Sequence, residues 1–237
     1  MLTIPEFQLP ELSKWRKKVL LDHAAQVLHA QQQMITPKGK NILHYTLKKK
    51  SRHISMNHYP KGDRIDHSTG AQYFYHCHRE NLESTEHGHF HCFMRYKHIP
   101  KSIKPLPLSD WDLFIDNPMT HLVAIAMNIH GQPIRLFTVN RWVTSETWYE
   151  AHHAPKLVKR FKMNLTDDPY WQVLDKWVEG MMQLFAPQIA WLQQARDVKI
   201  HEYSLQHGID NPYIDENLED LSEISINLQD QVQWLLG

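Results

Sequence analysis

Two segments in the first half of the chain, Tyr73–Arg79 and His87–Met94, alternate between histidines and apolar or small residues, and this pattern constrains the fold most. Successive side chains of a β-strand point to opposite faces of a sheet. If the two segments pair as an antiparallel hairpin, one face is a core face with Tyr75, Cys77, Phe90, Cys92 and Met94. The opposite face then collects His76, His78, His87, His89 and His91.

Two registers of this hairpin are compatible with the pattern. In one, His78 lies opposite His87 and His76 opposite His89; in the other, His78 lies opposite His89 and His76 opposite His91. Either register places imidazoles across the ladder, with Cβ atoms about 4.5–5.5 Å apart. Such a cluster presents three or more nitrogens from a rigid scaffold and leaves positions open for water or substrate. The pattern therefore predicts a site for one transition-metal ion, Fe, Zn or Cu.

The composition excludes several other classes of protein. The chain has only eight glycines and contains neither a GxGxxG nor a GxxxxGK[ST] motif, which argues against a dinucleotide fold or a P-loop. Its 18 histidines are spread along the sequence, unlike a tag, and its two cysteines cannot form a disulfide framework. We find no signal-peptide pattern and no apolar run that approaches a membrane span, so we expect a cytoplasmic protein.

The order of periodic segments predicts an α+β fold with an antiparallel sheet of about five strands. Alternation predicts strands at 53–59, 71–79, 87–96, 121–129 and 134–141, with a turn at 60–63. Helical spacing predicts an N-terminal helix over 11–34 and a long helix after Asp168, kinked at Pro187, which together cover the sheet. Residues 1–196 are expected to form a single metal-binding domain, and 197–237 an acidic linker followed by an amphipathic helix.

Charge is distributed unevenly along the chain. Residues 197–237 hold nine acidic residues and one basic residue, Lys199, a net charge of −8. The total charge is zero, so the remainder carries +8. A basic body with an acidic tail suggests an anionic partner, including nucleic acid, or a tail that docks on its own body or on a partner. A solvated acidic helix is the simpler alternative.

Two residues near the predicted cluster are candidates for catalysis. Glu86 directly precedes His87 and could be a general acid/base or an extra ligand, or simply a solvated loop acid. Arg141, between Asn140 and Trp142, could anchor an anionic group, or could cap its own loop. His53, His58 and His121 could each supply a further ligand from a neighbouring strand.

These features favour a metal-dependent enzyme, an oxygenase or a hydrolase. Its substrate is expected to be a small molecule, either anionic or neutral. The alternatives are a passive metal carrier and a structural metal site. Copper carriers usually add Met or Cys ligands, whereas the alternation directs Cys77 and Cys92 away from the histidine face. A catalytic site keeps open coordination positions, which a three-histidine site provides.

His89-Phe90-His91, followed by Cys92-Phe93-Met94, resembles the His-hydrophobic-His motif of HUH endonucleases. The resemblance implies a divalent ion on His89 and His91 and a tyrosine nucleophile on a later helix, for which Tyr149 is the well-placed residue. We rank this function second. Such a nuclease needs only two of these histidines, whereas the hairpin aligns three more on the same face.

Three segments, Tyr73–Arg79, Glu86–Arg95 and Arg135–Thr144, together resemble a group of uncharacterised bacterial proteins of unknown function. By our placement of strands and helices, the resemblance covers residues ~50–180. It implies a stand-alone domain and adds no activity.

Overall fold

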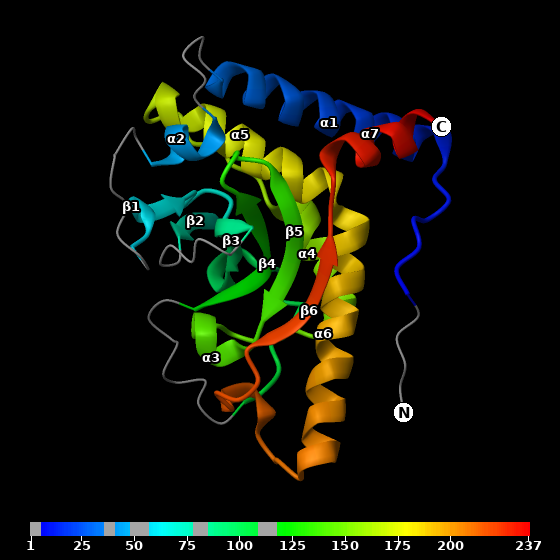
Figure 1. Cartoon of the computed structure of the whole chain (residues 1–237). Helices are drawn as coiled ribbons and strands as arrows, with labels where there is room; N and C mark the ends of the chain where they lie inside the picture. The colour runs from blue at the N-terminus through cyan, green and yellow to red at the C-terminus, as the bar shows by residue number, and fades with distance from the viewer. Residues whose placement is uncertain (1–5, 36–40, 48–56, 78–84, 109–117) are drawn as a thin grey trace.

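A single six-stranded antiparallel sheet forms the centre of the computed structural model (Figure 1). The structure describes residues 6–35, 41–47, 57–77, 85–108 and 118–237. Each strand pairs with the next in sequence, in the order β1-β2-β3-β4-β5-β6. The strands are β1 (Tyr59–Ile65), β2 (Ala71–Cys77), β3 (Glu86–Arg95), β4 (Met119–Asn128), β5 (Pro133–Val139) and β6 (Asp220–Ser225).

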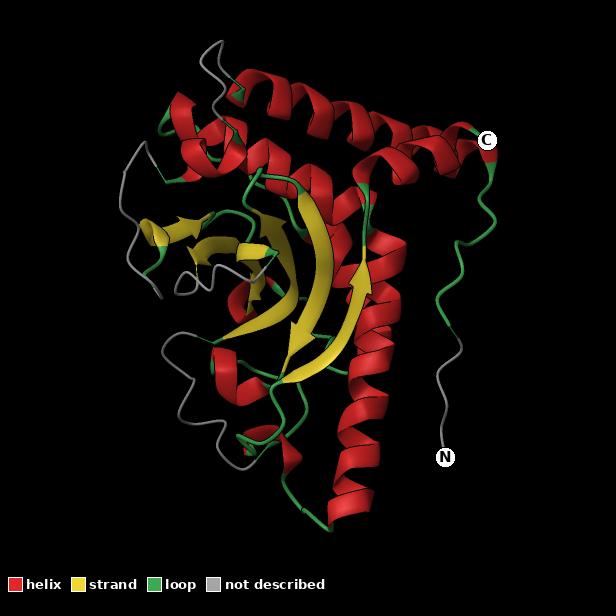
Figure 2. Cartoon of the chain, viewed as in Figure 1, coloured by secondary structure: helices red, strands yellow, loops and turns green. Residues whose placement is uncertain are grey.

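Seven α-helices accompany the sheet in the described segments, and the longer ones lie together on one side of it (Figure 2). They are α1 (Lys14–Met34), α2 (Ile42–Thr46), α3 (Arg141–Thr144), α4 (Ala154–Arg160), α5 (Pro169–Leu184), α6 (Ala186–His207) and α7 (Leu228–Leu236). The predicted α+β class, with an N-terminal helix and long C-terminal helices on an antiparallel sheet, is confirmed.

Helix ends follow from local sequence. Ser13 caps α1 by accepting a hydrogen bond from the backbone N–H of Arg16, and Asp168 caps α5 in the same way, with Pro169 in the first turn. The predicted kink near Pro187 is a complete break at Phe185, after which α6 begins with the proline in its first turn. A proline lacks the N–H that would continue the preceding helix, but a first turn does not need it.

The main hydrophobic core lies between the sheet and the helices, and we call it the helix-side core. Its sheet side includes Tyr73, Tyr75, Phe90, Cys92 and Met94, all fully buried. The ring of Phe90 packs on that of Trp177 from α5, with centroids 5.5 Å apart. The apolar face predicted from the alternation therefore packs on the helices, and the histidine-bearing face of the same strands points the other way.

The first strand differs from the prediction. Residues 53–56 lie outside the described residues, and β1 runs through the segment predicted as a turn. The pairing with β2 shifts register between Tyr59 and Arg64, and Gly62 and Asp63 have φ angles of 85° and 61°. An edge strand tolerates a proline and a bulge because one side of its backbone forms no ladder. Turn residues there do not end the strand.

The acidic C-terminal segment differs from the prediction in its linker part, whereas the predicted C-terminal helix is present as α7. Residues 197–207 continue α6 instead of forming a linker, and Asp220–Ser225 form β6, which pairs with β5. The sheet therefore has six strands. Pairing between β5 and β6 joins segments more than 80 residues apart, for example Arg135 with Ser225. Local periodicity does not reveal so distant a partner.

A buried ion-pair network ties the β1 edge of the sheet to α5. Arg64 of β1 donates to Asp175 through Nε at 3.0 Å and through Nη2 at 2.6 Å, and to Asp167 through Nη1 at 2.7 Å. The hydroxyl of Tyr73 also donates to Asp175, at 2.7 Å. The carboxylate of Asp175 is buried, so its charge depends on these partners.

We predict that Arg64→Met lowers the free energy of unfolding by about 3–5 kcal/mol, because it leaves the Asp175 carboxylate buried without its cation. Urea denaturation measures the loss. Lys18→Met is the control: Lys18 pairs with Asp22 in solvent, so its removal should change stability by less than about 0.5 kcal/mol. A loss below about 1 kcal/mol in Arg64→Met would contradict the prediction.

Candidate metal centre

Three histidines from β2 and β3 meet on the sheet face opposite the helix-side core. β2 and β3 pair antiparallel with His76 opposite His89 and Phe74 opposite His91, which is the first of the two registers considered. The side chains of all three histidines are buried, with 7%, 5% and 2% of the surface of His76, His89 and His91 exposed. We call these three residues the histidine cluster.

The ring nitrogens of the cluster converge on one point. The Nε2 atom of His89 lies 2.6 Å from Nε2 of His76 and 3.0 Å from Nε2 of His91. Nitrogens bound to one tetrahedral zinc ion lie roughly 3.3 Å apart, given Zn–N bonds of about 2.0–2.1 Å. The rings of His76, His89 and His91 therefore need to move apart by less than about 1 Å to hold such an ion.

A cation fits between these nitrogens better than added protons do. Burial lowers the pKa of His91 well below its ordinary value, and the neighbouring His89, His121 and His76 lower it further. Neutral imidazoles turn lone pairs toward each other, and a shared metal ion satisfies them all. Among the described residues, His76, His89 and His91 form a group whose ligand atoms all lie within 4.8 Å of one another.

Glu86 orients His89 from the far side of its ring. Nδ1–H of His89 donates to Oε1 of Glu86 at 2.8 Å, and Nη2 of Arg135 donates to the other oxygen at 2.9 Å. Burial by itself raises the pKa of Glu86, but the hydrogen bonds from His89 and Arg135 outweigh it and lower the pKa. An ionised carboxylate on Nδ1 leaves Nε2 free to bind a metal, as in carboxylate–histidine–zinc sites.

His121 of β4 is the corresponding partner of His91. Its Nε2 atom lies 3.0 Å from Nδ1 of His91. Burial, with the nearby Arg196 cation, lowers the pKa of His121 to about 3, so the ring is neutral. His121 can therefore accept Nδ1–H of His91 and leave the Nε2 atom of His91 for the ion.

His87 does not join the cluster, contrary to the prediction. Its Nδ1 atom lies 2.7 Å from the hydroxyl of Tyr75, which belongs to the helix-side core. The pairing of β3 with β4 shifts register between Glu86 and Gly88, and such a bulge reverses the alternation at the start of the strand. Glu86 faces the cluster as a result. His78 lies outside the described residues.

The predicted anion anchor, Arg141, is held by its own loop. Arg141 is buried at the start of α3, where its Nε–H donates to the carbonyl of Glu146 at 2.8 Å. The arginine at the cluster is Arg135, which lies opposite Ala126, itself opposite His89. The small side chain of Ala126 leaves room for Arg135 to reach Glu86. Strand parity alone could have identified Arg135 once the pairing of β3, β4 and β5 was known.

His58 lies beside the cluster on the more exposed side. Its ring stacks on Phe74 with centroids 3.6 Å apart and lies 6.5 Å from the ring of His76. Nδ1 of His58 contacts Oδ1 of Asp63 at 2.8 Å, and the other oxygen of Asp63 accepts from Gln72 at 2.8 Å. His58 is thus an oriented imidazole next to the cluster. His53 lies outside the described residues.

A second group of ligand-type side chains lies elsewhere on the molecule. Glu150, His152 and His153 also have ligand atoms within 4.8 Å of one another, but they occupy one short turn, and the first two are exposed. They lack the convergence from two strands that distinguishes the histidine cluster. This group is a useful control for metal binding.

Comparison with protein families confirms the resemblance to an uncharacterised group. A family model described as Domain of unknown function (DUF6969) matches residues 22–226. The chain belongs to this family. No curated protein and no solved structure was found to match it. The matched region contains all six strands and the whole histidine cluster. None of the helices in the described segments combines the length and apolar character needed to cross a membrane.

We predict that Glu86→Gln weakens metal binding by about 10- to 100-fold, because the charge that orients His89 is lost while the ligands remain. Competition with a chelating dye measures the dissociation constant. Glu223→Gln is the matched control, since Glu223 also pairs with Arg135 but is largely exposed. Its effect should stay within about threefold. If Glu86→Gln and Glu223→Gln raised the dissociation constant for the metal equally, Glu86 would act only through Arg135, and the prediction would be wrong.

Proposed function

We propose that the chain binds one divalent transition-metal ion through the Nε2 atoms of His76, His89 and His91, and that this ion serves an enzymatic reaction on a small molecule. One observation carries the proposal: the three Nε2 atoms converge, while the Nδ1 atoms of His89 and His91 are engaged by Glu86 and His121. Imidazole ligands suit Fe, Zn and Cu.

A catalytic role is favoured over a structural one by the number of ligands, which is three among the residues that the structure describes. Structural zinc sites are closed by four protein ligands, whereas three leave a position for water or substrate. The cluster also stands apart from the helix-side core, in which large side chains such as Trp177 and Phe90 supply the apolar burial. Folding therefore has a source of stability that does not involve a metal ion.

The side chains near the ion would have different roles, either positioning a ligand or exchanging a proton with the substrate. A bound ion would supply either Lewis acidity, as in a hydrolase, or redox chemistry, as in an oxygenase. Both oxygens of Glu86 are occupied, so its role is to position His89. His58, held by Asp63 and partly exposed, is better placed than Glu86 to exchange a proton with a substrate. The contact between Arg141 and its own loop removes the main support for an anionic substrate.

The described structure favours neither runner-up function. The hydroxyl of Tyr149 is buried, and burial raises the pKa of this side chain. Tyr149 also belongs to the helix-side core, which faces away from the histidine cluster, so it is a poor nucleophile for DNA cleavage. Cys77 and Cys92 are buried in the same core, which argues against a carrier with thiolate ligands.

The metal content of the protein tests the proposal directly. We expect elemental analysis of protein made without a tag to find about one transition-metal ion per chain, and we expect His89→Ala and His91→Ala each to lose it. The double variant His152→Ala/His153→Ala should retain the ion. Thermal unfolding of each variant checks that it is folded. An unchanged metal content per chain in the folded double variant His89→Ala/His91→Ala would contradict the proposal.

Access to the bound ion separates a catalytic from a structural site. We predict that cobalt(II)-substituted protein changes its visible absorption spectrum when azide is added, because an open position accepts this ligand. His91→Ala, which cannot hold the cobalt, is the control. A spectrum unaffected by azide, combined with unfolding of the metal-free protein, would identify a closed structural site instead.

A further inference from the structure

A hollow of about 490 Å³ lies between the loop after β3 and helix α4, and it has no part in the proposed metal chemistry. One wall is formed by Pro100, Ser102 and Ile103, and the other by Lys156, Lys159 and Arg160. We call it the basic hollow. α4 packs on the helix-side core through Leu157 and Val158, on the opposite face of the sheet from the histidine cluster.

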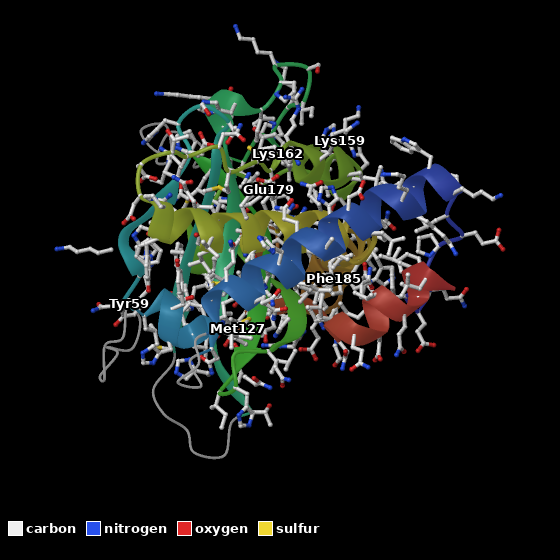
Figure 3. The ribbon with its side chains drawn as sticks, turned by 90° about the horizontal axis from the view of Figure 1, so that it is seen from above. Tyr59, Met127, Lys159, Lys162, Glu179 and Phe185 are labelled. Carbon is white, nitrogen blue, oxygen red and sulfur yellow. The ribbon has the colours of Figure 1, made fainter. Side chains whose placement is uncertain are left out.

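The charge in the basic hollow is unbalanced. No acidic side chain lies among the described residues that line it, and none of its three cations forms an ion pair with another described residue. Lys162, two residues after Arg160, behaves differently: its Nζ atom lies 3.1 Å from Glu179. Figure 3 shows Lys162 next to Glu179, with Lys159 apart from them on α4. The three cations are exposed, and no described acidic side chain offsets their mutual repulsion by an ion pair.

The dipole of α4 explains the positions of only some of these cations. Lys159 and Arg160 are in the last turn of α4, where the helix dipole favours cations. Lys156 is in the first turn, where the dipole disfavours a cation. All three nevertheless line the same hollow, which is the arrangement expected of an anion site.

We propose that the basic hollow binds a small molecule that carries a phosphate or diphosphate group. The planar guanidinium of Arg160 matches phosphate oxygens in pairs, the two lysines add point charges, and Ser102 offers a hydroxyl. Pro100 and Ile103 supply an apolar wall for the uncharged part of the ligand. The volume of the hollow is within the range of small-molecule sites, about 300–1,000 Å³.

The number of cations favours a small ligand over nucleic acid. Proteins that bind duplex DNA typically contact about 6–10 phosphates along an extended surface. Here three cations line one wall of a single hollow, and the next basic residue along the chain, Lys162 after the end of α4, is already paired with Glu179. A single phosphate or diphosphate group matches this charge.

Isothermal titration of the metal-free full-length protein with inorganic pyrophosphate, at about 0.15 M salt, tests the proposal. We expect saturable binding that Arg160→Ala weakens by roughly 10- to 100-fold, since a charge-assisted hydrogen bond contributes about 1.5–3 kcal/mol. Lys156→Ala should act in the same direction. Lys162→Ala is the matched control and should change the dissociation constant by less than about threefold.

Three results would overturn the proposal. The first is no pyrophosphate binding by the wild-type protein. The second is equal binding by the wild type and a folded Lys156→Ala/Arg160→Ala variant. The third is displacement of pyrophosphate by a short DNA duplex at lower concentration, with a steep dependence on salt, which would make nucleic acid the ligand. Because metal-free protein is used, failure here is separate from failure of the metal proposal, which His91→Ala tests.

Discussion

The antiparallel pairing of β2 with β3 is the interaction on which the candidate site depends. It places His76 opposite His89, and His91 one step further along the same face. The two backbones approach closely at Gly88, where a Cβ atom would lie 2.3 Å from the carbonyl oxygen of His76, so only glycine fits. A slip of one residue would turn the histidines into the helix-side core and expose Phe90, which makes the observed register strongly preferred.

The rest of the sheet converts this pairing into an organised site. His76, His89, Ala126 and Arg135 form one row across β2, β3, β4 and β5. Arg135 then links Glu86 to Glu223 of β6. The acidic C-terminal segment thus supplies a counter-charge to the arginine that holds Glu86 in place, and so contributes to the electrostatics around the histidine cluster.

One face of the sheet provides stability and the other forms the candidate metal site. The helix-side face buries large apolar groups and the Arg64–Asp175 pair, and these supply stability. The other face buries several imidazoles, and burial lowers the pKa values of His91 and His121 so that these two rings are neutral, which costs stability unless a ligand satisfies them. The separation makes it possible to alter the metal site without dismantling the core, and it is the reason that the proposed variants can be interpreted.

The sequence by itself determined what depends on local period: the α+β class, the helix-side core and the common face of His76, His89 and His91. A period of two residues is visible without any partner strand. The tertiary structure alone decided what depends on neighbours distant in the chain. The bulge against β4 turned His87 away and Glu86 inward, and β4 brought His121 to His91. Long-range contacts also selected Arg135 over Arg141 and added β6, because partners more than 40 residues away in the chain leave no local pattern.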